Sequence, residues 1–190
     1  MVAIVEVPPA RLGPMFGTGF GPSLESSAIC PDCGALFERW SSYPRWIRLP
    51  GQSWRRIRIR RVHCKGCGRT HAVLPSFAYA NRLDCSGVIW GAIEAAASGR
   101  GYRPIAAGSG VPATTVRDWL RRIRRDREPR RRYFAALCPQ LGAAVPRGPP
   151  GGGLASLVEV VEVAHQAAKT RFGDAAVGSI GAFSSASCSG

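Results

Sequence analysis

The sequence predicts an α+β protein: a small antiparallel β-ribbon that carries four cysteines, then a three-helix domain, then a flexible C-terminal tail. Two short Cys-x-x-Cys-Gly turns bracket a segment in which apolar and basic side chains alternate, as in a β-strand. Residues 84–140 carry apolar side chains at helical spacing, interrupted by glycine. The run from Gly142 to Gly153 is rich in glycine and proline, which favours a flexible linker.

Composition divides the chain of 190 residues into five parts. With 45% hydrophobic and 20% charged residues, it has enough apolar material for a packed core. We expect an N-terminal extension over 1–29, the ribbon over 30–77, the helical domain over 84–140, the linker over 141–153, and a short helix with a disordered tail over 154–190. The apolar residues of 154–161 recur at helical spacing, although their many valines also allow a strand.

The two cysteine turns are Cys30–Gly34 and Cys64–Gly68. Two residues between the cysteines let a tight turn point both sulfurs inward, and the glycine after them tolerates a left-handed backbone. Two such turns brought together supply four thiolates in a tetrahedron, which is the geometry of structural zinc. A filled shell leaves no open position for water, so we expect a fold-holding Zn²⁺ and no catalysis there. Its predicted ligands are Cys30, Cys33, Cys64 and Cys67.

The segment between the turns reads as β-structure. In Arg56–Arg60 the isoleucines would face one side and the arginines the other. Further strands are expected over 36–40 and 69–74. Residues 30–77 alone are too few for a robust apolar core, so a metal would have to hold them.

We interpret the remaining histidines and cysteines near these motifs as structural residues and not as metal ligands or nucleophiles. His63 and His71 flank the second turn, but four sulfurs already fill a shell, so we interpret both as ordinary strand residues. Cys85, Cys138 and Cys188 stand alone without a nearby base and are expected to be buried or tail thiols.

Residues 102–125 contain a glycine break between two helical segments. The first segment, 103–107, is short and is followed by Gly108-Ser109-Gly110. The second opens at Val111 and has Pro112 in its first turn, where a missing N–H costs nothing. Together with a helix expected over 87–97, this arrangement is typical of helix-turn-helix DNA-binding modules.

The last of these helices is amphipathic. Its apolar stripe, centred on Val116 and Leu120, would pack against the other two helices. On the opposite face, Arg117 could reach a guanine edge and Thr114 a neighbouring base, while arginines further along would meet phosphates. The DNA contacts we expect from this helix are Ala113, Thr114, Arg117, Arg121, Arg122, Arg124 and Arg125. The alternative is a three-helix core whose arginines are merely solvated.

The basic charge is clustered. The chain has 26 Lys and Arg against 12 Asp and Glu, a net charge of +14. Segment 39–69 carries ten basic residues and no acidic one, and segment 117–132 carries nine arginines and three acidic residues. This clustering makes nucleic acid the first partner to consider, and duplex DNA the favoured one. Within the ribbon we expect phosphate contacts from Arg56, Arg58 and Arg60.

Four aromatic residues lie among the ribbon arginines: Trp40, Tyr43, Trp46 and Trp54. Aromatic rings interleaved with arginine can stack on the bases of a single strand. A ribbon of this size also needs aromatic side chains for its core or for packing against arginine. Both interpretations stay open at the level of sequence.

The two cysteine turns, the arginine-rich strand before Cys64, the run Leu74-Pro75-Ser76-Phe77 and the helix-turn-helix together resemble an uncharacterised bacterial domain family. Its members are similar to the N-terminal DNA-binding part of insertion-sequence transposases. The resemblance covers about residues 28–125 and implies a zinc ribbon and helix-turn-helix that recognise DNA. Such transposases continue into a domain whose three carboxylates hold two Mg²⁺ ions. Here only Glu159, Glu162 and Asp174 follow Arg132, so we expect a binder or accessory protein.

The sequence therefore predicts a zinc-dependent, transposase-related or transcriptional-regulator-like DNA-binding protein. It offers no nucleophile–base pair, carboxylate dyad or phosphate-binding glycine loop, so we expect no enzyme. A protein–protein adaptor and a single-stranded nucleic-acid or RNA-binding ribbon are the alternatives, with 154–172 as the candidate surface for a protein partner or a second copy. We expect no membrane association and a cytoplasmic, nucleoid-associated protein with its cysteines reduced or metal-bound.

Overall fold

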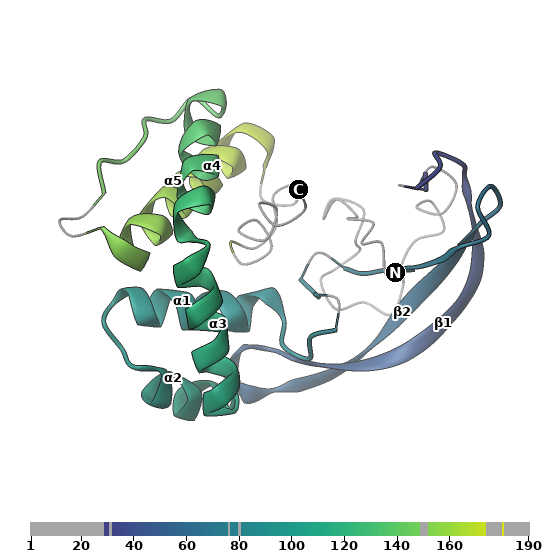
Figure 1. Ribbon diagram of the computed structural model, residues 1–190, viewed down its shortest axis with the longest axis horizontal. Coiled ribbons are helices and arrows are strands. Elements are labelled where there is room, and N and C mark those ends of the chain that lie inside the picture. Colours follow the sequence, from purple (N-terminus) through teal and green to yellow (C-terminus); the bar gives the residue numbers. More distant parts are fainter. Residues whose placement is uncertain are drawn as a thin grey trace.

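The computed structural model describes residues 29–30, 32–75, 77–79, 81–148, 152–173 and 180. Within them, a three-stranded antiparallel sheet is followed by five α-helices, which confirms the predicted α+β class. The sheet extends as a long curved arm from the helices (Figure 1). The predicted N-terminal extension, up to residue 28, and the predicted disordered tail from Ser184 lie outside the described residues.

The sheet has the order β1-β2-β3, with β1 over Phe37–Arg48, β2 over Trp54–Cys64 and β3 over Thr70–Val73. Strands β1 and β2 pair from Phe37↔Cys64 to Arg48↔Trp54, with a register shift between Arg39 and Ser41. A 3-10 turn, η3 (Pro50–Gln52), joins them. Strand β1 continues well past residue 40, where the sequence pattern ended. Pairing with β2 extends it through Pro44, which an edge strand tolerates.

Strand β2 alternates as predicted. Ile59 is fully buried and Ile57 half-buried, whereas Arg56 and Arg58 are exposed. Because successive side chains of a strand point to opposite faces, the two isoleucines face the interior and these two arginines face solvent. The alternation therefore gives the arm one packed face and one basic face.

The helices are α1 (Ser86–Ala97), α2 (Tyr102–Ser109), α3 (Ala113–Arg125), α4 (Arg127–Gln140) and α5 (Gly153–Phe172). Helix α3 begins at Ala113 with Pro112 at its N-cap, two residues later than the sequence pattern indicated. Residues 141–148 of the predicted linker form no helix or strand, and its last residue, Gly153, is the first residue of α5. None of the helices in the described part of the chain combines the length and apolar character needed to cross a membrane.

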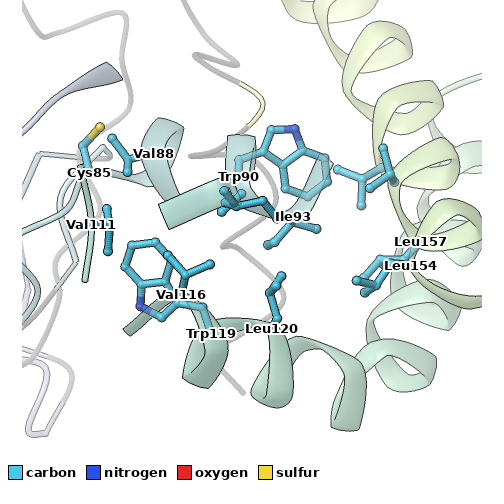
Figure 2. Close-up of a cluster of buried hydrophobic side chains, with 14 of the residues drawn as sticks. Cys85, Val88, Trp90, Ile93, Val111, Val116, Trp119, Leu120, Leu154 and Leu157 are labelled. Atoms are coloured by element: carbon cyan, nitrogen blue, oxygen red, sulfur yellow. The ribbon is translucent and has the colours of Figure 1, made fainter. Parts of the chain in front are cut away.

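One hydrophobic core contains residues of all five helices and of the end of the sheet that adjoins the helices. Figure 2 shows Trp90 and Ile93 of α1 facing Leu120 of α3 and the leucines of α5. Ile47 of β1 is fully buried in the same core.

Helix α5 is part of that core. Valine-rich 154–161 is helical, and eight residues of α5 are buried, most of them where it packs against α1 and α4. The sequence-based division placed this helix in a separate C-terminal part, because the glycine- and proline-rich linker precedes it. In the structure α5 instead packs within the helical domain, because burying its leucine, valine and alanine side chains against the other helices is favourable.

Candidate metal centre and basic surface

The two cysteine turns have the same backbone hydrogen bonds. The N–H of Gly34 donates to the carbonyl of Cys30 at 2.8 Å, and that of Gly68 donates to the carbonyl of Cys64 at 2.9 Å. Gly34 and Gly68 have φ angles of 73° and 70°, the left-handed conformation that glycine adopts without a Cβ penalty. The spacing of the sequence motif thus produces two matching knuckles.

The pairing of β1 with β2 brings the two knuckles face to face. The Sγ atoms of Cys30 and Cys67 are 3.7 Å apart, and those of Cys33 and Cys64 are 3.3 Å apart. All four sulfurs lie within 4.8 Å of one another. A tetrahedral site with metal–sulfur bonds of about 2.3 Å has sulfurs about 3.8 Å apart, so this group of cysteines is suited to hold a metal ion.

Electrostatics also favour a metal. The backbone N–H of Cys67, with burial opposing it and a hydrogen bond from Cys33 assisting, lowers the pKa of Cys64 to about 6. At Cys33 the N–H of Ala35 lowers the pKa, but neighbouring sulfurs, chiefly Cys64, and burial outweigh it and raise the pKa to about 12. The Cys64 thiolate therefore forms readily, whereas deprotonation of Cys33 beside it is unfavourable. A cation among the sulfurs would remove this opposition, since thiolates are its ligands.

His71, which the sequence analysis interpreted as an ordinary strand residue, contacts this cluster. Its imidazole is buried, with Nε2 3.6 Å from Sγ of Cys30 and 3.8 Å from Oδ2 of Asp32. Asp32 in turn pairs with Arg69 at 3.0 Å, joining the first knuckle to the residue after the second. The pairing of Val62 with His71 places this imidazole beside the sulfur of Cys30, where it could support that residue as a metal ligand. His63 points elsewhere, to Glu38 at 3.0 Å.

Replacing His71 is expected to weaken metal binding without abolishing it. His71→Ala removes the polar group beside Cys30 and leaves a hole next to the Phe37 ring, whose centroid is 5.0 Å from that of the imidazole. Loss of such a supporting contact typically costs 10–100-fold in metal affinity, and we expect a loss of that order in a competition titration with a chelator. His63→Ala is the matched control and should retain affinity. Equal affinity of both variants and the wild type would contradict the supporting role.

The turn between α2 and α3 has the predicted glycine. Gly110 adopts φ 67° and caps α2 through a hydrogen bond to the carbonyl of Ala106. Val111 after it is buried, and α3 then packs Val116, Trp119 and Leu120 into the core. The helix pair is thus held by the predicted apolar stripe.

The opposite face of α3 is exposed and basic. Thr114 is exposed, Ala113 is half-buried, and the predicted arginines Arg117, Arg121, Arg122, Arg124 and Arg125 are all exposed. Asp118 lies 3.8 Å from Arg117 and 3.7 Å from Arg121, whereas Asp126 pairs with Arg125 at 2.7 Å. Such surface pairs are weak, so phosphates could displace them.

A second basic face lies on the hairpin of β1 and β2. The register places Arg56 opposite Trp46 and Arg58 opposite Pro44. Arg58 donates to the hydroxyl of Ser42 at 3.0 Å. Arg60 follows on the same side and is half-buried.

The hairpin aromatics do not form a core. Trp40 is 59% exposed, Trp46 55%, Trp54 46% and Tyr43 39%. Two of them have ring contacts: the Arg48 guanidinium lies 4.7 Å from the centre of the Trp54 ring, and Trp40 lies beside His63 at 5.2 Å. The core interpretation is therefore wrong for these four residues, because the packed face of the arm is filled by isoleucines, while arginine packing holds for Trp54.

The hairpin end and the α2–α3 turn are joined directly. Gln52 donates to the carbonyl of Gly108 at 3.1 Å, and Arg48 donates to the carbonyl of Gly110. The same Arg48 forms a buried ion pair with Asp84 at 3.3 Å, where burial raises the pKa of the carboxyl against the opposing charge of Arg48. The end of the hairpin and the turn before α3 thus meet at one junction, which no sequence motif indicated.

Comparison with known proteins adds one match. Residues 30–119 match the family model described as Domain of unknown function (DUF6431), which spans both cysteine turns, the sheet, α1, α2 and half of α3. No curated protein and no solved structure matches the chain. The matched segment begins at Cys30 and ends at Trp119, so the candidate metal centre and the glycine turn before α3 both belong to the region that is similar to this family.

Proposed function

We propose that this chain is a zinc-dependent DNA-binding protein in which α3 reads duplex DNA and the arginines of β2 grip phosphates. The observation that carries this proposal is α3 itself. Its apolar stripe is buried after a left-handed glycine turn, and its other face presents five exposed arginines. A helix placed in this way after such a turn suits the major groove, which admits one α-helix.

The metal in this proposal is Zn²⁺, held by Cys30, Cys33, Cys64 and Cys67. Support comes from the donor set, since four thiolates in a closed tetrahedral arrangement are typical of structural zinc. The ion would fix the far end of the arm, leaving no open coordination position. On this account the chain binds and does not catalyse.

The biological role we propose is that of a transposase-related N-terminal module or a transcriptional regulator, acting in the cytoplasm on the nucleoid. The resemblance of the cysteine turns and helix-turn-helix to the DNA-binding part of insertion-sequence transposases supports it. The rival role, a protein adaptor or homodimer that docks through 154–172, finds less support. The residues that would form its apolar surface, among them Leu157 and Val161, are buried against the neighbouring helices.

Arg117 is the residue whose loss best tests duplex reading. Arg117→Ala removes a donor pair that can bind a guanine edge, so we expect a loss of about 1–3 kcal/mol in affinity for the preferred sequence and a relaxed preference at one base pair. Anisotropy titration with the preferred duplex and its single-base variants measures both effects. Arg147→Ala removes the same charge from an exposed position outside α3 and is the matched control. If both variants lost the same affinity for every sequence, Arg117 would contribute only non-specific electrostatic attraction, and the proposed base contact would be contradicted.

A further inference from the structure

We infer that the outer face of the β1–β2 hairpin binds unpaired bases of a DNA strand that continues from the duplex held by α3. This outer hairpin face consists of Trp46, Trp54, Arg56 and Arg58. The inference rests on the proposed function and specifies its substrate: a junction between duplex and single-stranded DNA.

The four residues share one side of the hairpin. Along β2, Trp54, Arg56 and Arg58 alternate with Ile57 and Ile59, which face the interior. Trp46 lies directly opposite Arg56, so its side chain emerges on the same face. The arrangement is a short row in which aromatic rings stand next to guanidinium groups.

Exposure of these rings calls for a partner. Trp46 and Trp54 are 55% and 46% exposed, although tryptophan is highly buried on average. Tryptophan and arginine are both enriched at the interfaces of soluble proteins relative to the rest of their surface. The packed side of the hairpin uses its isoleucines, so these tryptophans are not needed for the core.

Charge identifies the class of that partner. Between Arg39 and Arg69 the chain has ten basic residues and no acidic one, so the hairpin attracts a polyanion. Among polyanions, a single strand uses the tryptophans best, because its bases are free to stack on an aromatic face while its phosphates meet arginine. In a duplex the bases are already stacked on one another, and rings on this face would find no base to cover.

The position of the face relative to α3 favours one continuous ligand. Arg48, whose guanidinium lies over the Trp54 ring, also donates to the carbonyl of Gly110 just before α3. The row therefore starts at the N-terminal end of α3, where base contacts are expected. From Trp54 to Arg58 the strand runs about 13 Å, which is room for a few nucleotides.

Three DNA probes test the inference, with fluorescence anisotropy at 150 mM salt as the measurement. They are a blunt duplex that carries the sequence preferred by the wild type, the same duplex with a six-thymidine tail on either strand, and the tail alone. We expect a tail on one strand to raise affinity about 5- to 150-fold, the range for stacking one base on an aromatic ring. Trp46→Ala should abolish this gain and leave blunt-duplex affinity within about twofold.

Two further variants distinguish stacking from other effects. Trp46→Phe keeps an aromatic face and should restore part of the gain, which a fold defect would not allow. Phe172→Ala removes another exposed aromatic ring, at the end of α5, and should keep the whole gain. A tail that adds nothing to a bound duplex, or a gain that survives Trp46→Ala, would overturn the inference while the proposed function stands. Failure to bind any duplex would overturn the proposed function itself.

Discussion

Chelation of the proposed Zn²⁺ is expected to unfold the end of the arm that carries the four cysteines, while the helices stay folded. The buried hydrophobic cluster at that end consists of Cys30, Phe37, Val62 and Cys64, and two of these are proposed ligands. Structural zinc supplies about 10–16 kcal/mol of apparent binding free energy in small fingers, enough to decide whether such a unit folds. Without the ion, four sulfurs held within 4.8 Å of one another would repel or protonate.

Hydrogen exchange measured by mass spectrometry shows where the change occurs. Amides of 32–38 and 62–73 should lose protection on chelation, because their hydrogen bonds depend on the knuckles. Amides of α1, α3 and α5 should keep it, since the core of the helices includes Trp90, Leu120 and Leu157 and no proposed metal ligand.

Cysteine substitutions provide the matched pair for this prediction. Cys64→Ser removes one proposed ligand and should reproduce the chelated state. Cys85→Ser makes the same chemical change at the N-cap of α1, where serine is a favoured residue, and should leave metal content intact. An exchange pattern that is the same with and without chelator, or that is lost throughout the chain, would contradict a locally acting structural metal.

Salt is expected to weaken DNA binding by several orders of magnitude. Arginines predicted to meet DNA are exposed on both basic faces: five on α3 and two on the outer hairpin face, with Arg60 half-buried beside them. If six to ten phosphates are neutralised, affinity falls about 10³- to 10⁵-fold between about 50 and 200 mM salt, because bound counterions are released from the DNA. An anisotropy series across this range measures the slope.

The slope also shows which arginines contribute. With the tailed duplex as ligand, Arg121→Ala should reduce the slope by about 0.9 and Arg56→Ala, which would face the single strand, by about 0.7, since each removes one phosphate contact. The two reductions should add in the double variant. Arg147→Ala should leave it unchanged. A slope near zero for the wild type would mean that the basic faces do not meet phosphates.

Local spacing explains why the cluster of four cysteines could be predicted from the sequence. Each knuckle positions its two sulfurs through local features of the sequence. These are two residues between the cysteines and a glycine that adopts positive φ, at positions 34 and 68. The alternation in β2 and the glycine turn before α3 are likewise local signals, and the structure confirms both.

Features that depend on contacts between distant residues could not be predicted. His71 reaches Cys30 only because β3 pairs with β2, and Arg48 meets Asp84 only because the hairpin returns to the helices. The packing of α5 into the helical core could not be predicted either, because the apolar residues of a single helix do not show which elements will pack against them. Strand β1 was predicted too short because Ser41, Ser42 and Pro44 interrupt its pattern, while pairing with β2 extends it.

Selection from random duplex DNA with the zinc-loaded chain tests the central claim most directly. Retained duplexes at about 50 mM salt should converge on a common sequence, and the Arg117→Ala variant should recover a less restricted one. Loading is verified by metal analysis, with one zinc per chain expected. Retention of no duplex by the loaded chain at this salt would contradict the account.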